Sequence, residues 1–192
     1  MFRTALCVAL ATTALATAAS AAAPACMNDP RGDVVVERTK VTVDAPHLDI
    51  VRVSVARTAR ELVATFHTAG AAPGNGTWSM FFQYDNRYEF YARTVRGDGL
   101  SWVVADPRGA APGNYAYVVD KRQPRSPVRD LKGARADHSQ PGAVRIHLPL
   151  KEVGPATPKR GATARVTWAR ARQAQVSSYT EYEDYAGCGF IY

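Results

Sequence analysis

The segment LDIVRVSV, residues 48–55, decides the fold class. Valine recurs at every second position from Val51 to Val55, and polar residues occupy the positions between. Because successive side chains of a β-strand point to opposite faces, this spacing predicts a strand with one apolar and one polar face. The segment LVATFH, residues 62–67, repeats the alternation after a short polar connection and predicts the second strand of a hairpin.

Working outward, short alternating or aromatic segments recur along the chain, separated by turn-forming Gly, Pro, Asn and Asp. They are residues 78–84, 88–93, 100–104, 115–119, 144–148 and 163–170. One helical turn is expected at 150–153, and residues 120–142 predict either a long surface excursion or weak edge strands. The fold class expected is all-β, a two-layer antiparallel β-sandwich of jelly-roll type, with a closed barrel as the alternative.

The first 21 residues have the three parts of a secretory signal peptide. Arg3 supplies the positive charge, residues 4–18 form an uncharged apolar stretch, and Ala-Ser-Ala at 19–21 matches the cleavage pattern. We therefore expect a signal peptide over 1–21 and a single exported domain over 22–192. No later segment has the length and hydrophobicity of a membrane span, so we expect a secreted, extracellular protein.

Three cysteines occur in the chain, and Cys7 would leave with the signal peptide. The remaining pair, Cys26 and Cys188, predicts one disulfide that joins the two ends of the domain. Closing a loop of more than 100 residues stabilises a fold by about 4–5 kcal/mol on chain-entropy grounds. The alternative is a lipoprotein with Cys26 as its lipidated first residue.

The chain carries 24 basic and 17 acidic residues, a formal net charge of +7. A basic surface favours anionic partners, so we expect a glycan or an anionic cell-envelope polymer rather than nucleic acid. The basic residues are scattered along the chain. Solvated loops and strand faces are therefore the structural alternative for most of them.

Several segments together form a layout that resembles secreted, mostly uncharacterised bacterial β-sandwich domains. These are DPRGD at 29–33, LDIVRVSV at 48–55, ELVATF at 61–66, LPLKEVG at 148–154 and YEDYA at 182–186. In outline the layout is similar to family-nine carbohydrate-binding modules and to DOMON-type jelly rolls. The resemblance covers most of the exported chain and implies a sandwich fold. It implies little about function, because this architecture hosts sugar binding, haem binding and adhesion.

Aromatic side chains are the first candidates for a ligand site. Trp78, Trp102, Tyr88 and Tyr91 are available to pack against the C–H faces of sugar rings. Strand aromatics also serve as core residues or as cross-strand pairs, which is the structural alternative for each of them. Sequence alone does not separate these roles.

Acidic side chains are the second candidates. Asp29, Asp33 and Asp49 are predicted to converge at the start of the strand over 48–55, where their oxygens would suit a structural Ca²⁺. The alternative is an Asx-type turn in which Asp33 bonds nearby backbone N–H groups. No other cofactor is expected.

No catalytic motif is present: the chain has no G-x-S-x-G elbow, no H-E-x-x-H and no phosphate-binding glycine loop. The function expected is therefore a secreted, non-catalytic binding or envelope-associated module. A family-nine-like carbohydrate-binding module is the first alternative. A secreted hydrolase with an acidic pair such as Asp85 and Glu89 is the second.

Overall fold

The computed structural model describes most of the chain, and the structural statements below concern only that part. It covers residues 26–36, 38–71, 76–85, 87–96, 113–122, 128–162, 164–175 and 180–186. The expected signal peptide at 1–21, Trp102, Cys188 and the side chain of Cys26 lie outside it.

The first layer is a five-stranded sheet in which every pairing is antiparallel. Its order is β1 (Cys26–Asn28), β3 (Ile50–Arg57), β4 (Glu61–Thr68), β10 (Ala143–Pro149) and β9 (Arg135–Asp137). The hairpin predicted for residues 48–67 is confirmed as the β3–β4 pair at the centre of this sheet. Thr58 closes its turn by accepting from the backbone N–H of Glu61 at 2.9 Å.

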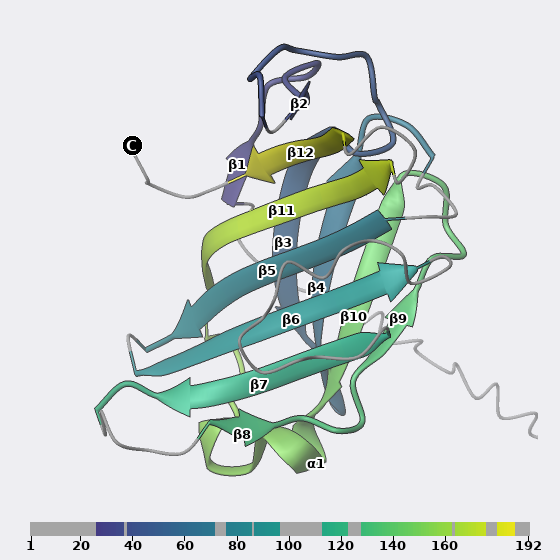
Figure 1. Ribbon diagram of the computed structural model, residues 1–192. Coiled ribbons are helices and arrows are strands. Elements are labelled where there is room, and N and C mark those ends of the chain that lie inside the picture. The colour runs from purple at the N-terminus through teal and green to yellow at the C-terminus, as the bar shows by residue number, and fades with distance from the viewer. Residues whose placement is uncertain are drawn as a thin grey trace, which may run out of the picture.

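The second layer is a seven-stranded antiparallel sheet. Its order is β2 (Val35–Val36), β12 (Thr180–Ala186), β11 (Arg165–Gln175), β5 (Gly76–Tyr84), β6 (Tyr88–Arg96), β7 (Asn114–Asp120) and β8 (Arg129–Asp130). In the view of Figure 1 the strands of this layer run across those of the other. The prediction of an all-β chain with two antiparallel sheets is confirmed.

Helix is confined to one short stretch of the described residues, α1 (Leu150–Val153) followed by the 3-10 turn η1 (Gly154–Ala156). This confirms the helical turn predicted at 150–153. Of the two readings of residues 120–142, weak edge strands fit, because β8 and β9 each end a sheet. In the described part of the chain, no helix has the length and hydrophobicity needed to cross a membrane.

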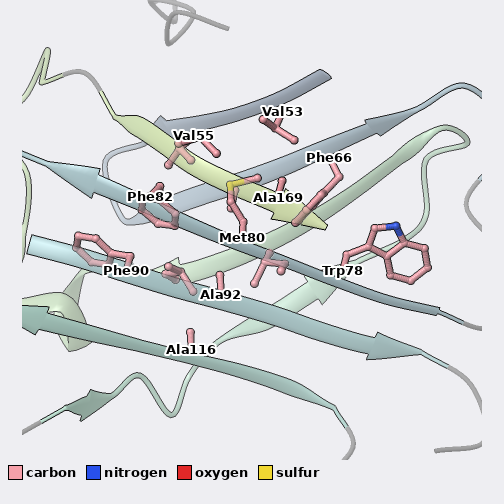
Figure 2. Packing of buried hydrophobic residues seen from close by; sticks show 14 of the residues in the cluster. Val53, Val55, Phe66, Trp78, Met80, Phe82, Phe90, Ala92, Ala116 and Ala169 are labelled. Carbon is pink, nitrogen blue, oxygen red and sulfur yellow. The ribbon is translucent and has the colours of Figure 1, made fainter. Parts of the chain in front are cut away.

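The core lies between the two sheets and is filled by alternate side chains of both (Figure 2). Val53, Val55 and Phe66 come from the five-stranded sheet, and Met80 and Phe82 from the seven-stranded sheet. Full burial of one such side chain contributes roughly 1.5–3 kcal/mol. The core therefore uses the inner face of each sheet and leaves the outer faces for other roles.

The alternation predicted for the first strand breaks at its start. A register irregularity lies between Ile50 and Arg52 in the pairing of β3 with β4. Ile50 is fully buried, whereas Val51 is only half-buried. The bulge therefore brings Ile50 into the core where simple alternation predicted Val51.

Candidate functional site

The structure separates the aromatic residues that the sequence singled out. Trp78 is fully buried on the inner face of β5, with its ring centroid 5.5 Å from that of His138, so it belongs to the core. Tyr88 is half-buried and packs against the core, with the guanidinium of Arg87 at 4.7 Å from its ring centroid. Tyr91 points to the outer face of the seven-stranded sheet, whereas Trp102 lies outside the described residues.

Tyr91 belongs to a row of aromatic side chains that the sequence did not reveal as a group. Trp168 of β11 lies opposite Phe81 of β5, Phe81 opposite Tyr91 of β6, and Tyr91 opposite Tyr117 of β7. The successive ring centroids are 4.9, 4.7 and 5.1 Å apart. Tyr115 flanks the row, 6.2 Å from Tyr91. We call these five side chains the aromatic row.

Cross-strand packing explains why the row is ordered. Each ring stands beside its partner on the neighbouring strand, and such aromatic pairs contribute roughly 0.5–1.5 kcal/mol beyond their burial. The rings are half-buried, so they pack on one another and still reach solvent. Four strands set side by side give the row a length of about 14 Å, since neighbouring strands lie about 4.8 Å apart.

A bulge in β11 places the largest ring in the row. The pairing of β11 with β5 is irregular between Val166 and Trp168, so Thr167 is an extra residue in this strand. Val166 is buried before the bulge and Ala169 after it, while Trp168 is half-buried on the outer face. Regular alternation from Val166 would have turned Trp168 into the core.

Arginine side chains run alongside the aromatic row. These side chains lie two residues along each strand from the members of the row, on the same face. Arg170 lies opposite Ser79, Ser79 opposite Arg93, and Arg93 opposite Tyr115. The Arg93 guanidinium is 5.7 Å from the Tyr115 ring centroid, within the range of a cation–π contact. Arg93 is only 5% exposed and Arg170 is half-buried, so the positive charge beside the row is largely enclosed.

Polar side chains border the other side. Gln83 Nε2 donates to Glu89 Oε2 at 3.1 Å, and Lys121 Nζ lies 3.8 Å from the same oxygen. Gln83 Nε2 also lies 3.5 Å from Thr167 Oγ1, which links β5 to the bulged part of β11. The outer face is thus divided into a polar, an aromatic and a basic strip.

The acidic residues predicted to converge do act on one another. Burial, then the charges of Asp33 and Asp49, raises the pKa of Asp29 to about 7. Burial and the Asp49 charge also raise the pKa of Asp33, partly offset by a hydrogen bond from its own backbone N–H. That bond is the local turn contact of the alternative interpretation. In the part of the chain that is described, no three His, Cys, Asp or Glu side chains form a ready-made metal cluster.

A second polar cluster lies on the outer face of the five-stranded sheet. Glu61 Oε2 is 2.9 Å from His147 Nδ1, and Arg135 Nη2 donates to Glu61 at 3.0 Å. Burial opposes ionisation of Glu61, but its hydrogen bonds to His147 and Arg135 outweigh that effect, so the pKa of Glu61 is lowered. The cluster ties β4, β9 and β10 together, which is a structural role.

No protein-family model, curated protein or solved structure matches this chain. The resemblance to family-nine carbohydrate-binding modules and DOMON-type domains stays a prediction.

Proposed function

We propose that this chain is exported from the cell and acts there as a non-catalytic binding module. Its ligand face is the outer face of the seven-stranded sheet, and its ligand is a glycan. The aromatic row, from Trp168 to Tyr117 across four strands, is the observation that carries the proposal. The sequence pattern of residues 1–21 supports export, and the jelly-roll resemblance supports sugar binding.

The chemistry of the row suits a chain of sugars. Pyranose rings present C–H faces that pack on aromatic planes, and rings held by cross-strand neighbours lose little freedom when a ligand arrives. A length of about 14 Å spans more than one sugar ring and so favours an oligomeric ligand. The net charge of +7 favours a glycan that carries carboxylate or sulfate groups over a neutral one.

A glycan array that includes neutral and acidic polysaccharides tests the proposal. We expect binding to acidic glycans, with affinity then measured by calorimetry. Trp168→Ala should weaken binding about tenfold or more, because truncating a large aromatic contact costs about 1.4 kcal/mol or more. Thr65→Ala, on the outer face of the other sheet, is the matched control and should bind as the wild type does.

Two results would overturn this function. One is an array with no glycan bound at a concentration that detects known sugar-binding modules. The other is a ligand whose affinity is unchanged in both Trp168→Ala and Tyr91→Ala. A hydrolase is the less favoured alternative, because Glu89 is engaged by Gln83 and Lys121 and Asp85 lies at the exposed turn after β5.

The disulfide between Cys26 and Cys188 is part of the same proposal. Cys26 pairs with Val53 in the backbone ladder of β1 and β3. The strand β12, which ends at Ala186 two residues before Cys188, packs against β3. Figure 1 draws the end of β12 beside β1. A bond between the two cysteines would then join one sheet to the other at their shared neighbour β3.

A further inference from the structure

Asp29, Asp33 and Asp49 come together where the N-terminal segment meets the start of β3. The backbone N–H of Asp29 donates to the carbonyl of Val51 at 3.2 Å. The backbone N–H of Gly32 donates to Asp49 Oδ2 at 2.8 Å. These two bonds hold the turn over 29–33 against the chain at 49–51.

Each of the three carboxylates has an oxygen that is buried without a hydrogen-bond partner: Asp29 Oδ2, Asp33 Oδ1 and Asp49 Oδ1. Asp49 is the most enclosed, since only 3% of the residue is exposed. Its charge acts on both other carboxylates, so the three side chains lie near one another. A buried carboxylate oxygen without a partner is costly, and in a native fold a bound ion or water explains such an atom.

The cluster also has no positive ion-pair partner among the residues that the structure describes. Other acidic residues have one: Arg135 for Glu61, Arg87 for Asp120 and Arg145 for Asp137. Among the described residues, no lysine or arginine forms an ion pair with any of the three aspartates. Although the chain has 24 basic residues, none of those described gives this negative site an ion-paired counter-charge.

We propose that Asp29, Asp33 and Asp49 bind a Ca²⁺ ion that fastens the N-terminal segment to the start of β3. All three donors are carboxylate oxygens, which hard cations such as Ca²⁺ prefer. Zn²⁺ sites, in contrast, are built mainly from His and Cys side chains. Ca²⁺ accepts six to eight oxygens in irregular geometry, so backbone carbonyls and water complete its shell. Mg²⁺ demands a tight octahedron and fits this arrangement less well.

The three carboxylates do not stand as a ready-made ligand set, since no group of three acidic, His or Cys side chains placed to hold a metal occurs among the described residues. Like charges repel, so a cation has to draw the carboxylates together. Two of them lie on the turn at 29–33, where Gly32 adopts φ +80° with nothing within 4 Å of an added Cβ. Calcium binding therefore requires Asp29 and Asp33 to rotate toward Asp49.

Calorimetry and thermal unfolding of the purified protein test the site. The protein is stripped with EGTA and titrated with CaCl₂, and its unfolding midpoint is measured with and without 1 mM Ca²⁺, or about 100 times a Kd near 10 μM. We expect a saturable one-to-one heat and a rise in the midpoint. Equal MgCl₂ should give a clearly smaller rise.

Asp29→Asn keeps the shape of the side chain and removes one charge. It should abolish the calcium response and, in EGTA, unfold at or above the wild-type midpoint because a repulsion is gone. Asp44→Asn, an exposed acid of the same N-terminal segment, is the control and should respond to Ca²⁺ as the wild type does. A wild type that shows neither heat nor a midpoint shift overturns the site, and so does an Asp29→Asn variant with the full response. Glycan binding is measured separately, so failure of this site leaves the ligand face untouched.

Discussion

Two neighbours fix the position of Trp78 in the core. A Cβ atom built on Gly76 would lie 2.7 Å from Cη2 of the Trp78 ring, so the indole lies directly over that glycine. The other neighbour is His138, whose ring is 5.5 Å away. The sequence offered Trp78 as a ligand contact, but a tryptophan two residues after a glycine does not reveal that its ring folds back over the backbone.

Gly76→Ala should therefore destabilise the fold. The added methyl group overlaps the buried Trp78 ring, and overpacking of this kind costs about 1–3 kcal/mol. Urea unfolding followed by Trp fluorescence measures the loss. Thr77→Ala, whose side chain points away from the core on the same strand, should stay within about 0.5 kcal/mol of the wild type. Equal stability of Gly76→Ala and wild type would contradict the packing.

His138 makes stability depend on pH. Burial first, and the charge of Arg96 second, lower the pKa of His138 below the usual 6.5 of a histidine, although Asp137 acts the other way. As pH falls through about 6.5, His138 therefore takes up a proton in the unfolded chain while it stays neutral in the folded protein. Because the unfolded state then binds more protons, the free energy of unfolding decreases as pH falls through that window. His67, also lowered by burial and by Arg52, acts in the same direction.

Between about pH 7 and about pH 5.5 we expect the stability of His138→Gln to rise relative to that of the wild type, while the raised pKa of Asp29 acts against the histidines equally in both proteins. The measurement is the free energy of unfolding from urea curves at several pH values. Its slope, not its absolute value, is the readout, because the variant also loses the contact with Trp78. The double variant with His67→Gln should show a larger rise relative to the wild type, because both lowered histidine pKa values are then removed. An unchanged slope in the double variant would exclude both histidines as the cause.

At the scale of single elements, two bulges limit what the sequence predicts. The β3–β4 hairpin follows the alternation of LDIVRVSV and LVATFH, so its existence was predictable. The residues that face the core were harder to predict. The irregularity near Ile50 places Ile50 in the core instead of Val51, and the one at Thr167 turns Trp168 outward. The aromatic row depends on that second bulge and on strand register, and neither is visible in a single sequence. Tyr91 was the predicted candidate that proved to belong to it.

Deleting Thr167 tests the β11 bulge. Without the extra residue, Val166 and Trp168 become neighbours, and regular alternation keeps Val166 inward and Trp168 outward, so the deletion should cost little. Deleting Ala171 from the regular part of the same strand is the control, because it turns the side chains on one side of the deletion to the other face. Each apolar side chain that loses its burial in this control costs roughly 1.5–3 kcal/mol. Chemical unfolding compares the two deletions, and equal losses of stability would argue against the bulge.

At the scale of the whole molecule, period-two patterning was enough to predict two antiparallel sheets, since each strand must bury one face against the other layer. The sequence also predicted in outline that Asp29, Asp33 and Asp49 come together, because the DPRGD segment was expected to lie near the start of the strand at 48–55. Sheet order was not predictable. It depends on pairings between distant segments, such as β5 with β11 and β4 with β10.

A covalent link between the sheets would show in unfolding experiments on the exported protein. If Cys26 and Cys188 are joined, the closed loop spans most of the domain, and its loss costs roughly 2–5 kcal/mol. Cys26→Ser, Cys188→Ser and the double variant should then lose the same amount, because either single change removes the whole bond. Added reductant should lower the free energy of unfolding of the wild type to that of the variants, and it should leave the stability of the variants unchanged. Peptide mapping without reductant identifies the pair directly. Two titratable thiols in the native exported protein, or a lipid on Cys26, would rule the bond out.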